Sequence, residues 1–253
     1  MASLDEYFNS PAERAEYEKF CAEQERGLEK FNLDKPALIC RWRMANKQVP
    51  MLNRHIRALS QRVVNGEPLT HNMLSWAKQH VEWSLAEGSY PDRNGVLMLV
   101  IDVNGNAAMS VGAYEPLGST SADALIERAS QARVEAGETR IAPELLGVAT
   151  ASGVVLAATA REYLCGAATL VEQLAQTKGC GVERGLLGDA ASVWDASVAH
   201  AALASVLDAA GAGAVPFLIS DEHGVVVASD APAGPAGELA AFLADACRKL
   251  FNK

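Results

Sequence analysis

Alanine and charge are divided unevenly along this chain of 253 residues, and that division constrains its fold most. The first hundred residues contain 9 alanines, 13 basic and 13 acidic side chains, whereas the remaining 153 contain 36 alanines, 9 basic and 18 acidic side chains. The formal net charge of −9 therefore lies entirely in the second part. Such a change is typical of two lobes that pack differently, so the sequence predicts a neutral lobe followed by an alanine-rich, acidic one.

Composition also argues against several classes of protein. Hydrophobic residues make up 49% of the chain, which is enough for a compact core and too much for a disordered tail. The acidic balance argues against a nucleic-acid partner, because such proteins need a basic face. No apolar run is long enough for a membrane helix. Residues 1–10 carry Asp5 and Glu6 and lack an apolar core, so we expect no secretory signal and a cytoplasmic protein.

The cysteines and histidines indicate neither a disulfide framework nor a metal site. The five cysteines are odd in number and widely scattered, and the five histidines show no HExxH or CxxC-type spacing, so we predict no structural zinc. Cys165 falls inside a predicted helix over 161–178. Since a helix interior does not lower a thiol pKa, we interpret Cys165 as a buried structural thiol, and whether it is reactive stays open.

Periodicity and turn residues predict an α+β fold of two lobes, one small with a strand, two helices and a hairpin, the other an alanine-rich mixed α/β lobe. We expect three parts: an N-terminal charged helix in 1–36, a small α+β lobe in 37–117 and a larger α/β lobe in 118–253. The boundary is placed where Pro116, Gly118 and a Ser/Thr run interrupt the pattern.

The expected elements follow from caps, turns and alternation. In the first half they are a charged helix over 11–31, a strand over 37–44, a helix from Leu52 that ends at Asn65-Gly66, a helix over 68–87 and a hairpin over 95–113 that turns at Asn104-Gly105. In the second half they are helices over 121–136, 161–178, 189–210 and 237–251, one or two strands within 145–159, and a hairpin formed by 214–220 and 224–229.

The most informative group of side chains is basic. Arg41 and Arg43 share one face of the expected strand, and Arg54 and Arg57 stand three apart on the next helix. If strand and helix pack together, their guanidinium groups converge on a carboxylate or phosphate, which arginine binds with paired hydrogen bonds. We therefore predict Arg43, Arg54 and Arg57 as ligand-binding residues for a small anionic metabolite. The alternative is that these arginines form a solvated surface.

The segment Val49-Pro50-Met51-Leu52-Asn53-Arg54-His55-Ile56-Arg57-Ala58-Leu59-Ser60, with Arg43 before it, resembles the small domain of the class IV aminotransferases. That family includes branched-chain and D-amino-acid aminotransferases and aminodeoxychorismate lyase. The likeness covers residues 37–117. In the second lobe, residues 164–169 and 181–184 are similar to the family's glycine-threonine turn and the segment after it. The resemblance implies a two-lobed fold, a cleft between the lobes and pyridoxal phosphate as cofactor.

The chain departs from the family at the residues that carry the chemistry. The family holds pyridoxal phosphate on a lysine soon after the small domain, yet no lysine occurs between Lys78 and Lys178. The arginine that the family places near the cofactor phosphate falls on Ala58, with Arg57 beside it. The acidic partner of the pyridine nitrogen has no counterpart. The resemblance therefore implies the fold more than the activity.

Three hypotheses follow from these residues. The first is an aminotransferase-like protein without the cofactor lysine that binds a small anionic metabolite between its lobes. The second is an active pyridoxal-phosphate-dependent aminotransferase or lyase that uses Lys178. The third is a non-enzymatic module, such as a homodimer, in which the charged helix over 11–31 docks on a partner. Sedimentation of a chain lacking residues 1–33 tests the third hypothesis.

Overall fold

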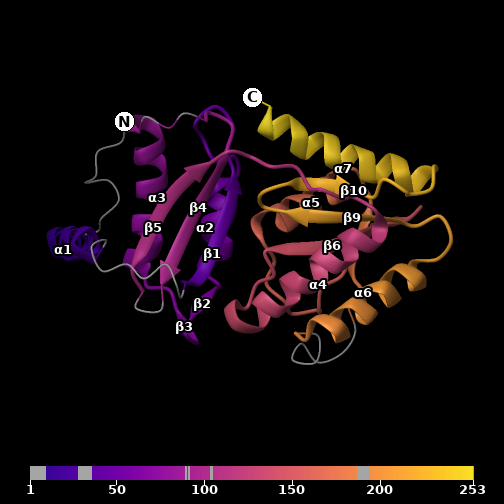
Figure 1. The fold of residues 1–253 in the computed structure, drawn as a ribbon, viewed down its shortest axis with the longest axis horizontal. Coiled ribbons are helices and arrows are strands. Elements are labelled where there is room, and N and C mark those ends of the chain that lie inside the picture. The colour runs from indigo at the N-terminus through magenta and orange to yellow at the C-terminus, as the bar shows by residue number, and fades with distance from the viewer. Residues whose placement is uncertain are drawn as a thin grey trace.

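A three-stranded and a five-stranded sheet divide the chain between two lobes that lie side by side (Figure 1). The computed structural model describes residues 10–27, 36–88, 90, 92–102, 105–186 and 194–252. The predicted α+β class and the two lobes are confirmed. The predicted boundary between residues 117 and 118 falls between the last strand of the small lobe and the first helix of the large one.

The small lobe is built on an antiparallel sheet of order β1-β4-β5. Alternation along β1 turns Leu38, Cys40 and Trp42 toward the helices of the lobe, where they form a buried cluster. The elements of this lobe are β1 (Pro36–Arg43), α2 (Leu52–Leu59), β2 (Val63–Val64), β3 (Glu67–Pro68), α3 (His71–Glu87), β4 (Val96–Asp102) and β5 (Ala107–Gly112). The predicted strand, helices and hairpin are therefore present, although Asn104 at the predicted turn lies outside the described residues.

The prediction that Asn65-Gly66 ends a helix is wrong. Both residues have positive φ, 53° and 82°, and they form the two-residue turn between β2 and β3. Two consecutive residues of positive φ match the tight hairpin turn that asparagine followed by glycine favours. Helix α2 consequently ends earlier, and α3 begins after Thr70, whose hydroxyl accepts the Met73 N–H at 3.2 Å.

The large lobe has three layers. Its sheet runs in the order β10-β9-β6-β7-β8, antiparallel except for the β7–β8 pair. Helices α5 and α7 cover the face that presents Leu145 and Phe217, while α4 and α6 cover the face that presents Leu146 and Leu218. The elements are α4 (Ala122–Thr139), β6 (Glu144–Ala149), β7 (Gly153–Leu156), α5 (Gly166–Thr177), β8 (Gly181–Arg184), α6 (Ala196–Ala210), β9 (Val215–Ser220), β10 (Gly224–Val227) and α7 (Pro235–Phe251).

The expected start of α5 at residue 161 is also wrong, because the chain stays irregular until Gly166. Cys165 therefore occupies the N-cap position of α5 and not a helix interior. Its side chain is buried, and burial raises the pKa of this thiol well above its ordinary value, with the charge of Asp221 acting in the same direction. The start of the helix predicted over 189–210 lies partly outside the described residues, and α6 begins after Asp195, which caps it.

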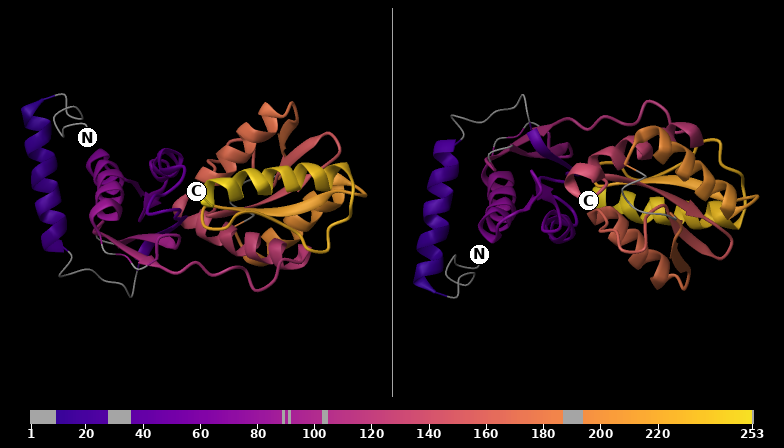
Figure 2. Two further views of the ribbon diagram at one scale, coloured as in Figure 1. Left: turned by 90° about the horizontal axis from the view of Figure 1, so that it is seen from above. Right: turned by 90° about the horizontal axis from the view of Figure 1, so that it is seen from below.

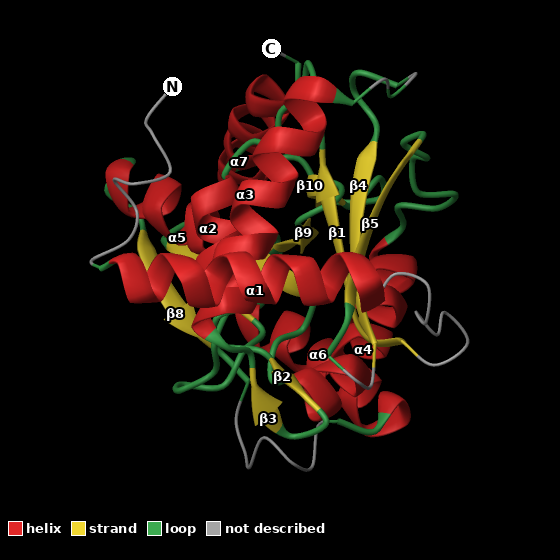
Figure 3. Ribbon diagram, turned by 90° about the vertical axis from the view of Figure 1, so that its left-hand side faces the viewer, coloured by secondary structure: helices red, strands yellow, loops and turns green. Residues whose placement is uncertain are grey.

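Helix α1 (Pro11–Gly27) lies on the outer side of the small lobe, beyond α3 (Figures 2 and 3). Its anchor is Tyr17, which is 6% exposed and donates from its hydroxyl to Gln79 Oε1 at 2.8 Å. The last residues of the predicted helix, 28–31, lie outside the described residues. Among the helices that the structure describes, none is long and apolar enough to cross a membrane.

Candidate functional site

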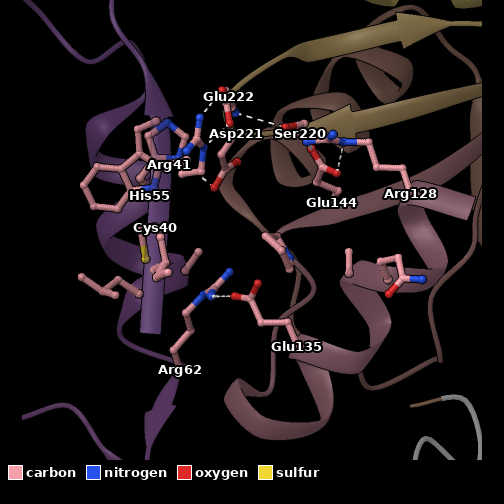
Figure 4. Close-up of a pocket in the computed structure, with 17 residues that line it drawn as sticks. Cys40, Arg41, His55, Arg62, Arg128, Glu135, Glu144, Ser220, Asp221 and Glu222 are labelled. Atoms are coloured by element: carbon pink, nitrogen blue, oxygen red, sulfur yellow. Dashed lines mark hydrogen bonds and ion pairs between the residues drawn. The ribbon is translucent and has the colours of Figure 1, made fainter. Parts of the chain in front are cut away.

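A cleft of about 470 Å³ separates the two lobes, a volume in the range of small-molecule sites (Figure 4). Strand β1, helix α2 and the turn after it form its small-lobe wall, while α4, the start of β6 and the β9–β10 turn form its large-lobe wall. Apolar side chains such as Ile39, Ala58 and Pro143 alternate along it with charged ones. Its charged or ionisable lining residues are Cys40, Arg41, His55, Arg62, Arg128, Glu135, Glu144, Asp221 and Glu222.

The β9–β10 turn joins the lobes at one end of this cleft. The Arg43 N–H, at the end of β1, donates to the Asp221 carbonyl at 3.1 Å. Beside it, the Arg41 guanidinium donates to both carboxylate oxygens of Glu222, at 2.5 and 2.8 Å. Asp221 and Glu222 are only 8% and 6% exposed, although acidic residues in a turn are most simply interpreted as surface charges. Burial acts to raise the pKa of Glu222, but the Arg41 hydrogen bond and the charges of His223, Arg41 and Arg128 together outweigh it, so the pKa is lowered.

His55 is held beside Asp221 from three directions. Its imidazole stacks on Trp42, with ring centroids 5.2 Å apart and planes 11° apart. Nδ1 lies 3.2 Å from an Asp221 carboxylate oxygen, although the two groups are not aligned for a hydrogen bond. Gly166 borders the ring so closely that a Cβ there would lie 2.5 Å from Nδ1. The second nitrogen, Nε2, is buried and has no hydrogen-bond partner in the described structure.

Asp221 is itself fixed in place. Its other carboxylate oxygen accepts the Ala167 N–H, at the N-terminus of α5, at 2.7 Å. Burial acts to raise the pKa of Asp221, but the facing His55, the Ala167 N–H and the Arg62 charge together outweigh it, so the pKa is lowered. Asp221 therefore stays ionised. It contacts Ala167 on α5 of the large lobe and His55 on α2 of the small lobe.

Arg62 marks the other end of the cleft. Its side chain reaches from the small lobe toward Glu135 of α4, and its guanidinium points into the space between the lobes (Figure 4). The residue is 4% exposed, yet its described contacts include a single hydrogen bond, from Nη1 to Glu135 Oε1 at 3.0 Å. A guanidinium has five N–H donors. Arg62 therefore keeps unused donors at a buried position on the cleft.

Arg128 contrasts with Arg62, because the Glu144 carboxylate binds two of its guanidinium nitrogens. Nε lies 2.5 Å from Glu144 Oε2, and Nη2 lies 2.9 Å from Glu144 Oε1. The same Nη2 lies 3.2 Å from His223 Nε2. Burial lowers the pKa of His223 to about 4, and the charges of Arg128, Arg41 and Arg43 act in the same direction, against the opposing charge of Glu222. His223 is therefore neutral in the folded protein near neutral pH.

The stability of the fold should fall as the pH drops from about 6.5 toward 4. An unfolded His223 takes up a proton near 6.5, whereas the folded one stays neutral until about 4, so protons favour the unfolded state within this window. The loss is no more than about 3 kcal/mol. Urea unfolding between pH 7 and 4.5 measures it, and His223→Gln should flatten the dependence. Parallel curves for both proteins would show that His223 does not cause it.

The structure does not bring the three predicted binding arginines together on one ligand space. The Arg43 guanidinium stacks on the Tyr114 ring, with Cζ 3.2 Å from its centroid. Arg54 donates to Thr169 Oγ1 at 3.0 Å and to Gln173, both on α5. Arg57 is exposed on α2. None of the three lines the cleft, and their role in ligand binding stays a prediction.

The residues that sequence reasoning missed are Arg62, His55 and their large-lobe partners. A signal for two of them was present, since His55 and Arg62 stand seven apart, which places them on one helical face. The partners Glu135 and Asp221 carry no such signal, because they come from segments far away in the chain. The described residues contain no group of three or more side chains suited to a metal ion.

Lys178, the lysine of the alternative hypothesis, lies away from the cleft. It follows the last residue of α5, and its Nζ lies 4.4 Å from the centroid of the Phe242 ring on α7. No lysine lines the cleft among the described residues. The described cleft lining therefore offers no amine that could bond covalently to pyridoxal phosphate.

Comparison with known proteins leaves the family open. No family model matches the chain, and no curated protein sequence matches it. Among solved structures, a protein from Corynebacterium glutamicum ATCC 13032 described as a "putative aminotransferase" is similar to this chain, with 11% identity, coverage of 85% of this chain and 84% of the other, and a TM-score of 0.43. A likeness at that level carries no argument about function. The fold and site define an α+β protein of two lobes with a charged cleft between them.

Proposed function

We propose that this protein binds a small metabolite with an anionic group in the cleft between its lobes, and that Arg62 is the anchor. One observation carries the proposal: a guanidinium that is 4% exposed, with one hydrogen bond, points into a cleft of about 470 Å³. The donors of Arg62 that Glu135 leaves unused can bind a carboxylate or a phosphate in the cleft. The net charge of −9 does not oppose a small anion, because the field of distant charges is screened in salt.

Calorimetric titration with small probes tests this proposal. Pyruvate, succinate and inorganic phosphate supply anionic groups of different shape, while acetone and butane-1,4-diol are uncharged counterparts. We expect at least one anion to bind at 1:1 stoichiometry and neither uncharged compound to bind. Absence of binding by all three anions, or equal binding of the uncharged pair, overturns the proposal.

The residues present do not fit pyridoxal phosphate as the resembling family holds it. Arg62 suits a phosphate group, but the described cleft lining offers no lysine for the covalent bond. We therefore derive no chemistry through that cofactor and propose an aminotransferase-like protein that does not transaminate. A reducing compartment such as the cytoplasm suits the five free cysteines.

Incubation with pyridoxal phosphate should produce no stoichiometric lysine adduct. After borohydride reduction, mass spectrometry of the intact protein is expected to show no more modification in the native chain than in the Lys178→Arg variant. Since the only amine suggested for the cofactor packs on Phe242, substitution should change nothing. A single reducible adduct that disappears in Lys178→Arg, together with transamination, would restore the catalytic alternative.

A further inference from the structure

We propose that the ligand of the cleft is a monocarboxylic acid with an apolar body, and that Ile39 selects this body while Arg62 holds the carboxylate. This inference rests on the proposed function and names the chemical class of its ligand. It is carried by one juxtaposition. An accessible apolar side chain and a guanidinium with unused donors line the same cleft, whose other guanidinium groups are already paired.

The first step of the argument is the access of a ligand to Arg62. Among its described contacts, Glu135 binds only Nη1 of the guanidinium (Figure 4). Four side-chain nitrogens of the described structure are fully enclosed without a hydrogen bond, namely Arg43 Nε, both ring nitrogens of His55 and Arg133 Nε. The Arg62 nitrogens are not among them, so those that Glu135 leaves unbound are open to the cleft. A carboxylate that enters the cleft can therefore reach them.

The second step is that the other guanidinium groups of the cleft are already matched by carboxylates. Both carboxylate oxygens of Glu222 bind Arg41. Those of Glu144 bind Arg128. The Arg41 and Arg128 side chains are also 51% and 42% exposed, whereas that of Arg62 is 5% exposed. Because water screens exposed charges, a ligand carboxylate gains most at Arg62, which favours an acid with a single carboxylate.

The third step is that the neutral polar side chains of the cleft already have partners. The Gln131 amide donates to Glu127 at 2.8 Å. The Ser220 hydroxyl accepts the N–H groups of Glu222 and His223, both at 3.2 Å, and Ser220 is 2% exposed. A hydroxyl group or a second carboxylate on the ligand would therefore lose water without gaining equivalent hydrogen bonds from these side chains. An apolar body carries no such cost.

The fourth step is the apolar wall of the cleft. Alternation along β1 turns Ile39 to the face opposite the buried Leu38, and Ile39 lines the cleft. Its side chain is 38% exposed, so it keeps apolar surface that a ligand can cover. Ala58 and Ala132 also line the cleft, and their methyl groups add apolar surface while they occupy little volume. Burial of a hydrocarbon chain against this wall stabilises the complex.

A series of straight-chain acids tests this inference by calorimetry on the full chain. Each buried methylene contributes about 0.8 kcal/mol, which is about fourfold in affinity. From propionate to hexanoate we therefore expect affinity to rise about fourfold per carbon over at least two steps. Adipate and 6-hydroxyhexanoate have the same chain with a polar far end, so they should bind about tenfold less tightly than hexanoate. Hexan-1-ol lacks the carboxylate and should not bind.

Two matched variants separate the role of Ile39 from a general effect on the fold. Ile39→Thr keeps the β-branched shape that suits a strand and removes apolar surface. Its affinity for hexanoate should fall about tenfold, while that for propionate should change by less than about twofold. Val134→Thr changes a residue of the same 38% exposure that does not line the cleft, so it should leave the series unchanged. If Ile39→Thr does not fold, Ile39→Val should still weaken hexanoate binding by about fourfold.

The outcomes distinguish this inference from the function on which it rests. Binding of pyruvate, succinate or phosphate without any gain along the series overturns the selection of an apolar body and leaves anion binding intact. Equal loss of hexanoate affinity in Ile39→Thr and Val134→Thr also overturns the inference, as does hexanoate binding that is undiminished in Arg62→Met. Failure of pyruvate, succinate, phosphate and the straight-chain acids alike to bind overturns both.

Discussion

Replacing Arg62 with methionine is expected to weaken the binding of small anions in the cleft by about 10- to 100-fold. A hydrogen bond to a charged group contributes roughly 1.5–3 kcal/mol, and each 1.4 kcal/mol corresponds to about tenfold in affinity. Methionine keeps the buried aliphatic length of the side chain while removing every donor. Calorimetry with the acid that binds the native chain measures the change.

Arg57→Met and Arg54→Met are the matched comparisons, because they test the arginines that the sequence analysis singled out. Arg57 is exposed and Arg54 already contacts Thr169 and Gln173, so we expect neither variant to lose more than about threefold in affinity. If Arg57→Met abolishes binding and Arg62→Met does not, the anchor is Arg57 and the cleft assignment is wrong.

Glu135→Gln should strengthen the binding of anions, whereas Arg62→Met weakens it. Removal of this carboxylate leaves a buried guanidinium without its charged partner, which costs about 3 kcal/mol of unfolding free energy. An anion then supplies the missing charge, so it should raise the melting temperature of Glu135→Gln more than that of the native chain. Arg62→Met should cost less, because the remaining Glu135 side chain is 35% exposed and reaches water. An equal response to the anion in both proteins would contradict the role of Arg62.

Most of the regular structure follows from local patterns, which explains why it could be predicted. Alternation of neighbouring residues indicates strand β1, and turn residues indicate the β9–β10 hairpin. Both signals lie within a few positions of the chain. Strand β8, in contrast, pairs with β7 in parallel across the intervening helix α5, and its residues are half-buried or exposed. No local pattern indicates such a strand.

The candidate site depends on contacts between distant segments, and this limits what a sequence can show. Arg41 and Arg43 share a strand face as expected, but the partner of Arg41 is Glu222, which is 181 positions away. The same distance effect hides the pairing of Arg62 with Glu135. Local spacing groups the arginines of one strand and one helix, whereas in the structure carboxylates from the large lobe bind Arg41 and Arg62.

Replacement of Glu162 with alanine is expected to destabilise the large lobe by about 3–5 kcal/mol. Glu162 lies between β7 and α5, is 9% exposed at its side chain and binds Arg133 of α4 through both carboxylate oxygens. Arg133 is only 1% exposed, so its charge has no route to water when the carboxylate is gone. Glu162 also accepts the Thr159 N–H at 3.0 Å, which holds the loop that leads to α5.

A double-variant cycle separates the cost of a stranded charge from the value of the ion pair. Arg133→Met with Glu162→Leu removes both charges, so urea unfolding should show it to be more stable than Glu162→Ala. A double variant no more stable than Glu162→Ala would contradict the stranded-charge explanation.

The same loop leads to the site. Because it ends at Gly166 and Ala167, which border His55 and hold Asp221, Glu162→Ala should also weaken anion binding measured at a temperature where the variant stays folded. Undiminished binding under those conditions would show that the loop does not position the cleft residues.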